Sequence, residues 1–102
     1  MGDSKEISIG ERLSSARKKK RLRYKKLSSE LNIEESYLIA LEEENFHLIP
    51  GGEAYVKGFL RSYSKKLNLD PDEIITQYTE LNYELRKNII RTSSNDNLNQ
   101  AQ

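Results

Sequence analysis

Apolar residues recur at helical spacing along most of the chain, and residues that favour helix boundaries flank each periodic stretch. Near the N-terminus, Ile9, Leu13 and Ala16 follow one another at intervals of four and three residues. Ser8 and Glu11 have the spacing of a capping box, which predicts that a helix begins at residue 9. The same reasoning along the chain predicts five helices, at about residues 9–20, 24–31, 34–44, 53–67 and 71–91.

Short polar connections separate these helices and indicate how they are arranged. Asn32 tolerates the left-handed backbone that a tight turn requires, so the second and third helices are predicted to form a helix-turn-helix. Pro50 and the two glycines that follow it end helical order before the fourth helix. Asp70 is expected to be the N-cap of the fifth helix, with Pro71 as its first residue.

The predicted fold is an all-α, five-helix bundle that contains a helix-turn-helix and ends in a disordered C-terminal tail. Residues 8–91 are expected to form the domain, and residues 1–7 a flexible N-terminus. Residues 92–102 consist mainly of Ser, Asn, Asp and Gln, so they are interpreted as a disordered tail or the start of a linker. The longest apolar run, residues 37–41, is far shorter than the roughly 20 residues that a membrane helix needs.

Opposite charges are segregated along the chain although the net charge is only +1. Residues 12–26 hold nine basic residues and no acidic one, whereas residues 30–53 hold seven acidic residues and no basic one. Clustered like charges lower stability by repulsion, so the basic stretch is expected to bind an anionic partner, either a membrane surface or a nucleic acid. The residues expected to do so are Arg17, Lys18, Lys19, Lys20, Arg21, Arg23, Lys25 and Lys26.

A motif at residues 48–70 resembles one known family. The sequence reads LIPGG at 48–52, YVKGFLRSY from Tyr55 to Tyr63, and LNLD from Leu67 to Asp70. This resembles the cytoplasmic domain of the RodZ family of bacterial cell-shape proteins, in which a helix-turn-helix is followed by L-P-G, Y-x-x-G-F-L-R-x-Y and L-x-L-D. The segments IGERL at 9–13, YL at 37–38 and ALE at 40–42 match as well, together with Phe46, so the resemblance covers about residues 9–78.

The resemblance implies a cytoplasmic adaptor domain. Members of this family bind the actin-like filament protein MreB and couple it to the cell-wall elongation machinery. They continue through a basic linker into a single membrane-spanning helix, so the parent protein is expected to cross the bacterial cell membrane once. The filament contact of the family lies on the fourth helix and corresponds here to Tyr55 and Phe59.

The pattern on the fourth helix is consistent with that assignment. Val56, Leu60, Tyr63 and Leu67 recur at i, i+4, i+7 and i+11 and form one inward stripe. Tyr55 and Phe59 lie four residues apart and about 100° from that stripe, on another face of the helix. With Lys57, Arg61 and Lys66 they are predicted to form a partner-binding surface, an aromatic anchor with a charged rim. The alternative is that both rings pack against the fifth helix as core.

Sequence-specific DNA reading by the third helix is disfavoured. Glu34, Glu35 and residues 42–44 give that helix five carboxylates and no Lys or Arg, whereas DNA affinity depends on cation–phosphate contacts. The basic stretch is the better candidate for an anionic partner, with a lipid surface favoured and non-specific nucleic-acid binding as the alternative function. A third interpretation is a homo-oligomeric scaffold, in which the acidic helix meets the basic stretch of a neighbour.

Catalysis has little support in the sequence. The chain has no cysteine, its single histidine, His47, lies in a predicted turn, and no zinc-ligand spacing or phosphate-binding glycine loop is present. We therefore expect a binding protein without catalytic residues, metal or cofactor.

Overall fold

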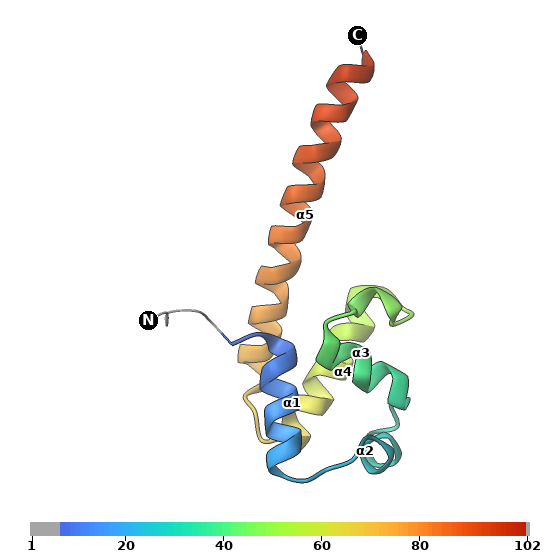
Figure 1. Cartoon of the computed structure of the whole chain (residues 1–102), viewed down its shortest axis with the longest axis vertical. Helices are drawn as coiled ribbons and strands as arrows, with labels where there is room; N and C mark the ends of the chain where they lie inside the picture. The colour runs from blue at the N-terminus through green and yellow to red at the C-terminus, as the bar shows by residue number, and fades with distance from the viewer. Residues whose placement is uncertain (1–6, 102) are drawn as a thin grey trace.

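The computed structural model describes residues 7–101, and within them every regular element is helical (Figure 1). The elements are α1 (Ile9–Lys19), α2 (Tyr24–Leu31), α3 (Glu35–Glu43), a 3-10 turn η1 (Phe46–Leu48), α4 (Gly52–Lys66) and α5 (Pro71–Ala101). The all-α fold with a helix-turn-helix is confirmed, and the boundaries of the first four helices lie within one residue of the predicted ones.

Local capping explains why these helices begin and end where they do. The Ser8 side chain accepts a hydrogen bond from the backbone N–H of Glu11 at 3.2 Å, as the capping box predicts. Asn32 ends α2 with a left-handed backbone (φ 59°) and thereby turns the chain into α3. Asp70 accepts from the backbone N–H of Asp72 at 2.9 Å and begins α5.

One hydrophobic core joins all five α-helices. Tyr63 of α4 is fully buried in this core, together with Leu13 of α1, Leu38 and Leu41 of α3 and Ile74 of α5. Helices α4 and α5 lie side by side, and α1 packs across α3 and α5 (Figure 1). Helix α4 therefore lies between the helix-turn-helix and the last helix, which leaves only part of its surface for a partner.

Helices α1 and α3 approach closely because residue 10 is a glycine. A Cβ on Gly10 would lie 2.0 Å from the backbone oxygen of Glu42, so any other residue would force the two helices apart. Glu44, in a left-handed conformation (φ 59°), accepts from the Gly10 N–H at 2.8 Å and caps the start of α1. This contact fixes the end of α3 to the beginning of α1.

Helix α5 continues past its predicted end near residue 91 and reaches Ala101. It covers most of the segment 92–102 assigned to a disordered tail, and the physical reason is that no Gly or Pro interrupts the backbone after Pro71. The disorder of residues 92–102 in solution stays a prediction. The predicted flexible N-terminus lies outside the described residues except for Ile7. Among the helices of residues 7–101, none combines the length and apolar character of a membrane span.

Candidate partner-binding surface

Three aromatic side chains from α3 and α4 form a cluster at the molecular surface. Tyr55 is 58% exposed, and its ring meets the half-buried ring of Phe59 edge-on, with centroids 6.0 Å apart. Phe59 in turn stacks on Tyr37 of α3, with centroids 5.9 Å apart and an interplanar angle of 15°. We call Tyr37, Tyr55 and Phe59 the aromatic cluster. Its inner rings are held in place while Tyr55 presents a large apolar surface to solvent.

The inward stripe of α4 orients this cluster. Val56, Leu60 and Tyr63 are buried, as predicted, and about 100° per residue of helical rotation places Phe59 at the border between core and solvent. Gly51 takes a left-handed backbone (φ 96°) just before α4, and the ring of Tyr55 covers it so closely that a Cβ there would lie 2.5 Å from ring carbons. The turn before α4 thus packs against the exposed ring of Tyr55.

Tyr55 and Phe59 therefore both reach the surface, but Tyr55 is mostly exposed whereas Phe59 is half-buried. The interpretation as core is wrong for Tyr55 and holds in part for Phe59, which packs against the buried cluster with its inner edge. Outside α4, Phe59 stacks on Tyr37 of α3, whereas the core interpretation placed both rings against the fifth helix.

The three cations predicted as the rim lie on two different flanks of α4. Lys66 lies on the side of the aromatic cluster, where its Nζ pairs with Glu30 of α2 at 2.5 Å. Arg61 follows Phe59 by two residues, hence about 200° around the helix, and faces α5, where it pairs with Asp72 at 3.6 Å. Lys57 is one turn before Arg61 on that opposite flank. The prediction that Lys57 and Arg61 flank the aromatics is wrong, because their spacing from Tyr55 and Phe59 turns them away.

Tyr37 was not predicted as part of the surface. Periodicity within α3 marks Leu38 and Leu41 as buried and gives Tyr37 no special status. Its contact with Phe59 joins residues 22 positions apart, and only the packing of α3 on α4 brings them together.

Within the basic stretch, Arg17 has a structural role. Its guanidinium donates to both carboxylate oxygens of Glu42, at 2.7 and 3.2 Å, and to the backbone oxygen of Leu22 at 3.2 Å. It also lies over the Tyr24 ring, 4.3 Å from the centroid. The prediction that Arg17 contributes to an anion-binding surface is therefore wrong, because a buried carboxylate already neutralises it.

The rest of the basic stretch is on the surface. The exposed cations around the turn from α1 to α2 are Lys18, Lys19, Lys20, Arg21, Arg23, Lys25 and Lys26, and we call them the basic turn. Lys26 alone among them takes part in an ion pair within residues 7–101, at 3.9 Å from Glu30.

Glu42 is the acceptor around which the helix-turn-helix is organised. Besides Arg17, the hydroxyl groups of Tyr24 (2.8 Å) and Tyr63 donate to it. Burial and these hydrogen bonds raise the pKa of both tyrosines, and the bond to Glu42 raises the pKa of Arg17. Donors from α1, α2 and α4 therefore surround Glu42, in contrast to the exposed Glu43 beside it.

Helix α3 keeps an acidic outer surface even though Glu42 and Glu44 are used internally. Glu35 and Ser36 are exposed near its start, and Glu43 is exposed near its end. These are the positions that would approach base edges or phosphates if α3 entered a DNA groove, and carboxylates there repel the phosphate backbone.

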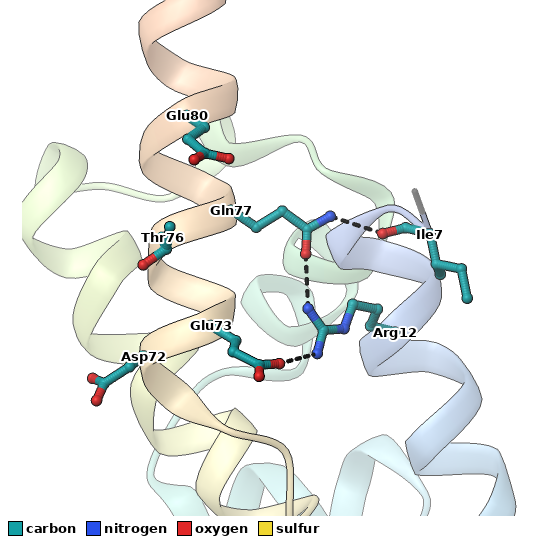
Figure 2. Close-up of a pocket in the computed structure, with 7 residues that line it drawn as sticks. All are labelled: Ile7, Arg12, Asp72, Glu73, Thr76, Gln77 and Glu80. Atoms are coloured by element: carbon teal, nitrogen blue, oxygen red, sulfur yellow. Dashed lines mark hydrogen bonds and ion pairs between the residues drawn. The ribbon is translucent and has the colours of Figure 1, made fainter. Parts of the chain in front are cut away.

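A shallow groove between α1 and α5 is lined mainly by polar groups that already have partners (Figure 2). Arg12 donates to Gln77 and Glu73, both at 3.0 Å, and Gln77 donates to the backbone oxygen of Ile7 at 2.7 Å. These bonds fasten α1 to α5, so we assign the groove a structural role. Residues 7–101 contain no cluster of His, Cys, Asp and Glu that could hold a metal, and His47 is exposed in η1.

Comparison with known proteins agrees with this architecture. Residues 12–74 match a family described as a helix-turn-helix domain. The chain is also similar to an uncharacterized membrane protein, YmfM, of Bacillus subtilis (strain 168), with 36% identity over 52 residues. That match covers 51% of this chain and 18% of the relative, so the chain spans less than a fifth of that protein. No solved structure matches the chain significantly.

Proposed function

Because the chain belongs to the family of RodZ-type helix-turn-helix domains, we propose that it is an adaptor that docks an actin-like filament protein of the MreB type. The aromatic cluster is the docking surface, with Tyr55 as the anchor and Phe59 and Tyr37 as its rigid base. In the parent protein the domain is cytoplasmic and links the filament to the membrane-bound cell-wall elongation machinery.

The single observation that carries this proposal is the exposure of Tyr55 at 58% over a stacked aromatic base. A large exposed aromatic supported by rigid neighbours loses little conformational entropy when it enters a pocket on a partner, which is typical of binding hot spots. The filament contact of the family also corresponds to Tyr55 and Phe59. The exposure of Tyr55 and the family motif therefore support the same docking surface.

The position of α5 agrees with an adaptor role. Its C-terminal end lies at one extreme of the molecule, and the turn between α1 and α2 lies at the other (Figure 1). If the parent chain continues from α5 toward a membrane, as the family resemblance implies, α5 is a spacer that holds the bundle away from the bilayer. A filament then reaches the bundle without contacting lipid.

Non-specific nucleic-acid binding through the basic turn is the alternative function. The exposure of seven cations favours it, and the exposed carboxylates of α3 oppose it. Binding to a random-sequence duplex that is lost between about 50 and 200 mM salt, without any binding to filaments, would favour this alternative.

The test is co-sedimentation of the chain with purified MreB-type filaments, with Tyr55→Ala as the variant. Loss of a hot-spot aromatic is expected to weaken binding by roughly 2 kcal/mol, or about thirtyfold. Tyr83→Ala is the matched control, because Tyr83 is equally exposed (60%) but lies on α5, outside the aromatic cluster. Equal pelleting of both variants would contradict the proposed surface.

A further inference from the structure

The basic turn contains cations that the stability of the fold does not require. Lys18 and Lys19 lie in the last turn of α1, where positive charge interacts favourably with the helix dipole. Arg23, Lys25 and Lys26 lie at the start of α2, where positive charge is unfavourable, and the first turn of α2 holds no acidic residue. The Arg23 side chain makes no capping hydrogen bond either. Lys26 is partly compensated by Glu30 one turn later. Arg23 and Lys25 have no such partner among the described residues and oppose the formation of α2, which indicates a role outside folding.

The side of α4 that carries Phe59 leads from the aromatic cluster toward the basic turn. Lys66 lies two helical turns after Phe59 on the same side of α4 and pairs with Glu30 of α2 at 2.5 Å. Glu30 is also 3.9 Å from Lys26, one turn earlier on α2. Beyond this pair lies a shallow depression lined by Arg21, Arg23, Lys25, Lys26, Ser29 and Glu30. A partner that covers Phe59 and Lys66 therefore approaches the basic turn directly.

We infer that the docked partner is a protein whose surface combines an apolar pocket for Tyr55 with a cluster of carboxylates opposite the basic turn. This inference rests on the proposed function and deepens it by giving the partner surface its charge pattern. Complementary charge at the rim of an interface accelerates association and fixes the orientation of the partner, while the aromatic anchor supplies most of the affinity.

The charges around the aromatic cluster favour a protein over a uniform polyanion. Tyr37 follows two exposed carboxylates, Glu34 and Glu35, at the start of α3. A bilayer of anionic lipid or a nucleic-acid duplex that covered both the cluster and the basic turn would bring phosphates against these carboxylates. A protein surface varies in charge over such distances, so it can place carboxylates opposite the basic turn and not opposite α3.

The experiment measures the Kd for MreB-type filaments between about 50 and 300 mM salt, a range over which the screening length falls by a factor of about 2.5. The double variant R23Q/K25Q is compared with K65Q/K87Q, which removes the same charge from exposed lysines outside the basic turn. We expect R23Q/K25Q to bind about tenfold more weakly at low salt and with a flatter salt dependence, while the control stays within about twofold. The melting temperature of R23Q/K25Q should be unchanged or higher, because α2 loses unfavourable charge at its start.

Two outcomes would overturn the inference and leave the proposed function standing. One is that R23Q/K25Q binds filaments like the unaltered chain at every salt concentration. The other is that phosphatidylglycerol vesicles or a random-sequence DNA duplex compete with filaments for the unaltered chain and not for R23Q/K25Q, which would make phosphate the true ligand of the basic turn. If the unaltered chain fails to bind filaments at all, the proposed function and the inference both fail.

Discussion

Arg17 of α1 and Glu42 of α3 form a two-point ion pair, with Nε to Oε2 at 2.7 Å and Nη2 to Oε1 at 3.2 Å. The side chains are 12% and 5% exposed, so solvent screens the pair weakly. Two tyrosine hydroxyls complete the coordination of the carboxylate. Residues 34–44 carry five glutamates, and this pair neutralises one whose side chain is almost fully buried.

Glu42→Gln should destabilise the domain strongly. The substitution leaves the buried Arg17 without a countercharge, and breaking a buried pair from one side costs about 3 kcal/mol. The neighbouring Glu43→Gln is the matched control, because Glu43 is exposed and its loss should change the free energy of unfolding by less than about 0.5 kcal/mol. Urea denaturation measures both values. Equal stability of the two variants would show that the Glu42 network contributes nothing.

Stability should fall at alkaline pH because of Tyr63 and Tyr24. Burial raises the pKa of both hydroxyls in the folded state, and donation to Glu42 raises it further. In the unfolded chain, tyrosine ionises at about pH 10, so above that pH unfolding releases protons and the free energy of unfolding decreases as pH rises. Thermal melting between pH 8 and pH 11 measures the decrease. Tyr63→Phe should be less stable at pH 8 and should show a weaker decline above pH 10; an unchanged slope would exclude Tyr63 as its source.

Two glycines on helices should respond oppositely to the same substitution. Gly10→Ala places a methyl group against the backbone oxygen of Glu42 and should cost about 3 kcal/mol, since backbone cannot move aside as a side chain does. Gly58→Ala meets no atom within 4 Å and should stabilise α4 by roughly 0.5–1 kcal/mol. Chemical denaturation of the two variants tests the close approach of α1 to α3, which a mild effect at Gly10 would contradict.

Phe59→Ala and Tyr55→Ala should separate folding from docking. Phe59 is half-buried and stacks on Tyr37, so its truncation should lower the free energy of unfolding by about 1–3 kcal/mol as well as weaken filament binding. Tyr55 is mostly exposed, so Tyr55→Ala should change the melting temperature by only a few degrees. Circular dichroism melts of the two variants provide the comparison. A larger loss of stability for Tyr55→Ala would assign Tyr55 to the core.

The sequence predicted the elements of this fold well because their signals are local. Capping at Ser8 and Asp70, the left-handed turn at Asn32 and the buried stripe of α4 each depend on residues within one or two turns of each other. The burial of Tyr63 followed from the same periodicity, whereas the exposure of Tyr55 was one of two alternatives that periodicity left open.

Features that depend on contacts between helices were not predictable in this way. The roles of Arg17 and Glu42 join positions 25 residues apart, and the Tyr37–Phe59 stack joins positions 22 apart. Charge counting alone grouped Arg17 with its basic neighbours and Glu42 with the other acids of the third helix, because no pattern within one helix distinguishes them. The error in placing Lys57 and Arg61 beside the aromatics has a different origin. Each lies two residues from Phe59, which is about 200° around the helix, so the sequence alone already separates them from the aromatic cluster.

The packing of α4 against α5 has a mechanical consequence. Arg61 and Asp72 fasten one flank of α4 to α5, while Tyr55 and Phe59 occupy the opposite flank. Tension applied along the axis of α5 would therefore act as shear on the α4–α5 contact before it reached a partner docked at the aromatic cluster as proposed above. Shear of this kind loads the whole α4–α5 contact at once, and not one side chain after another.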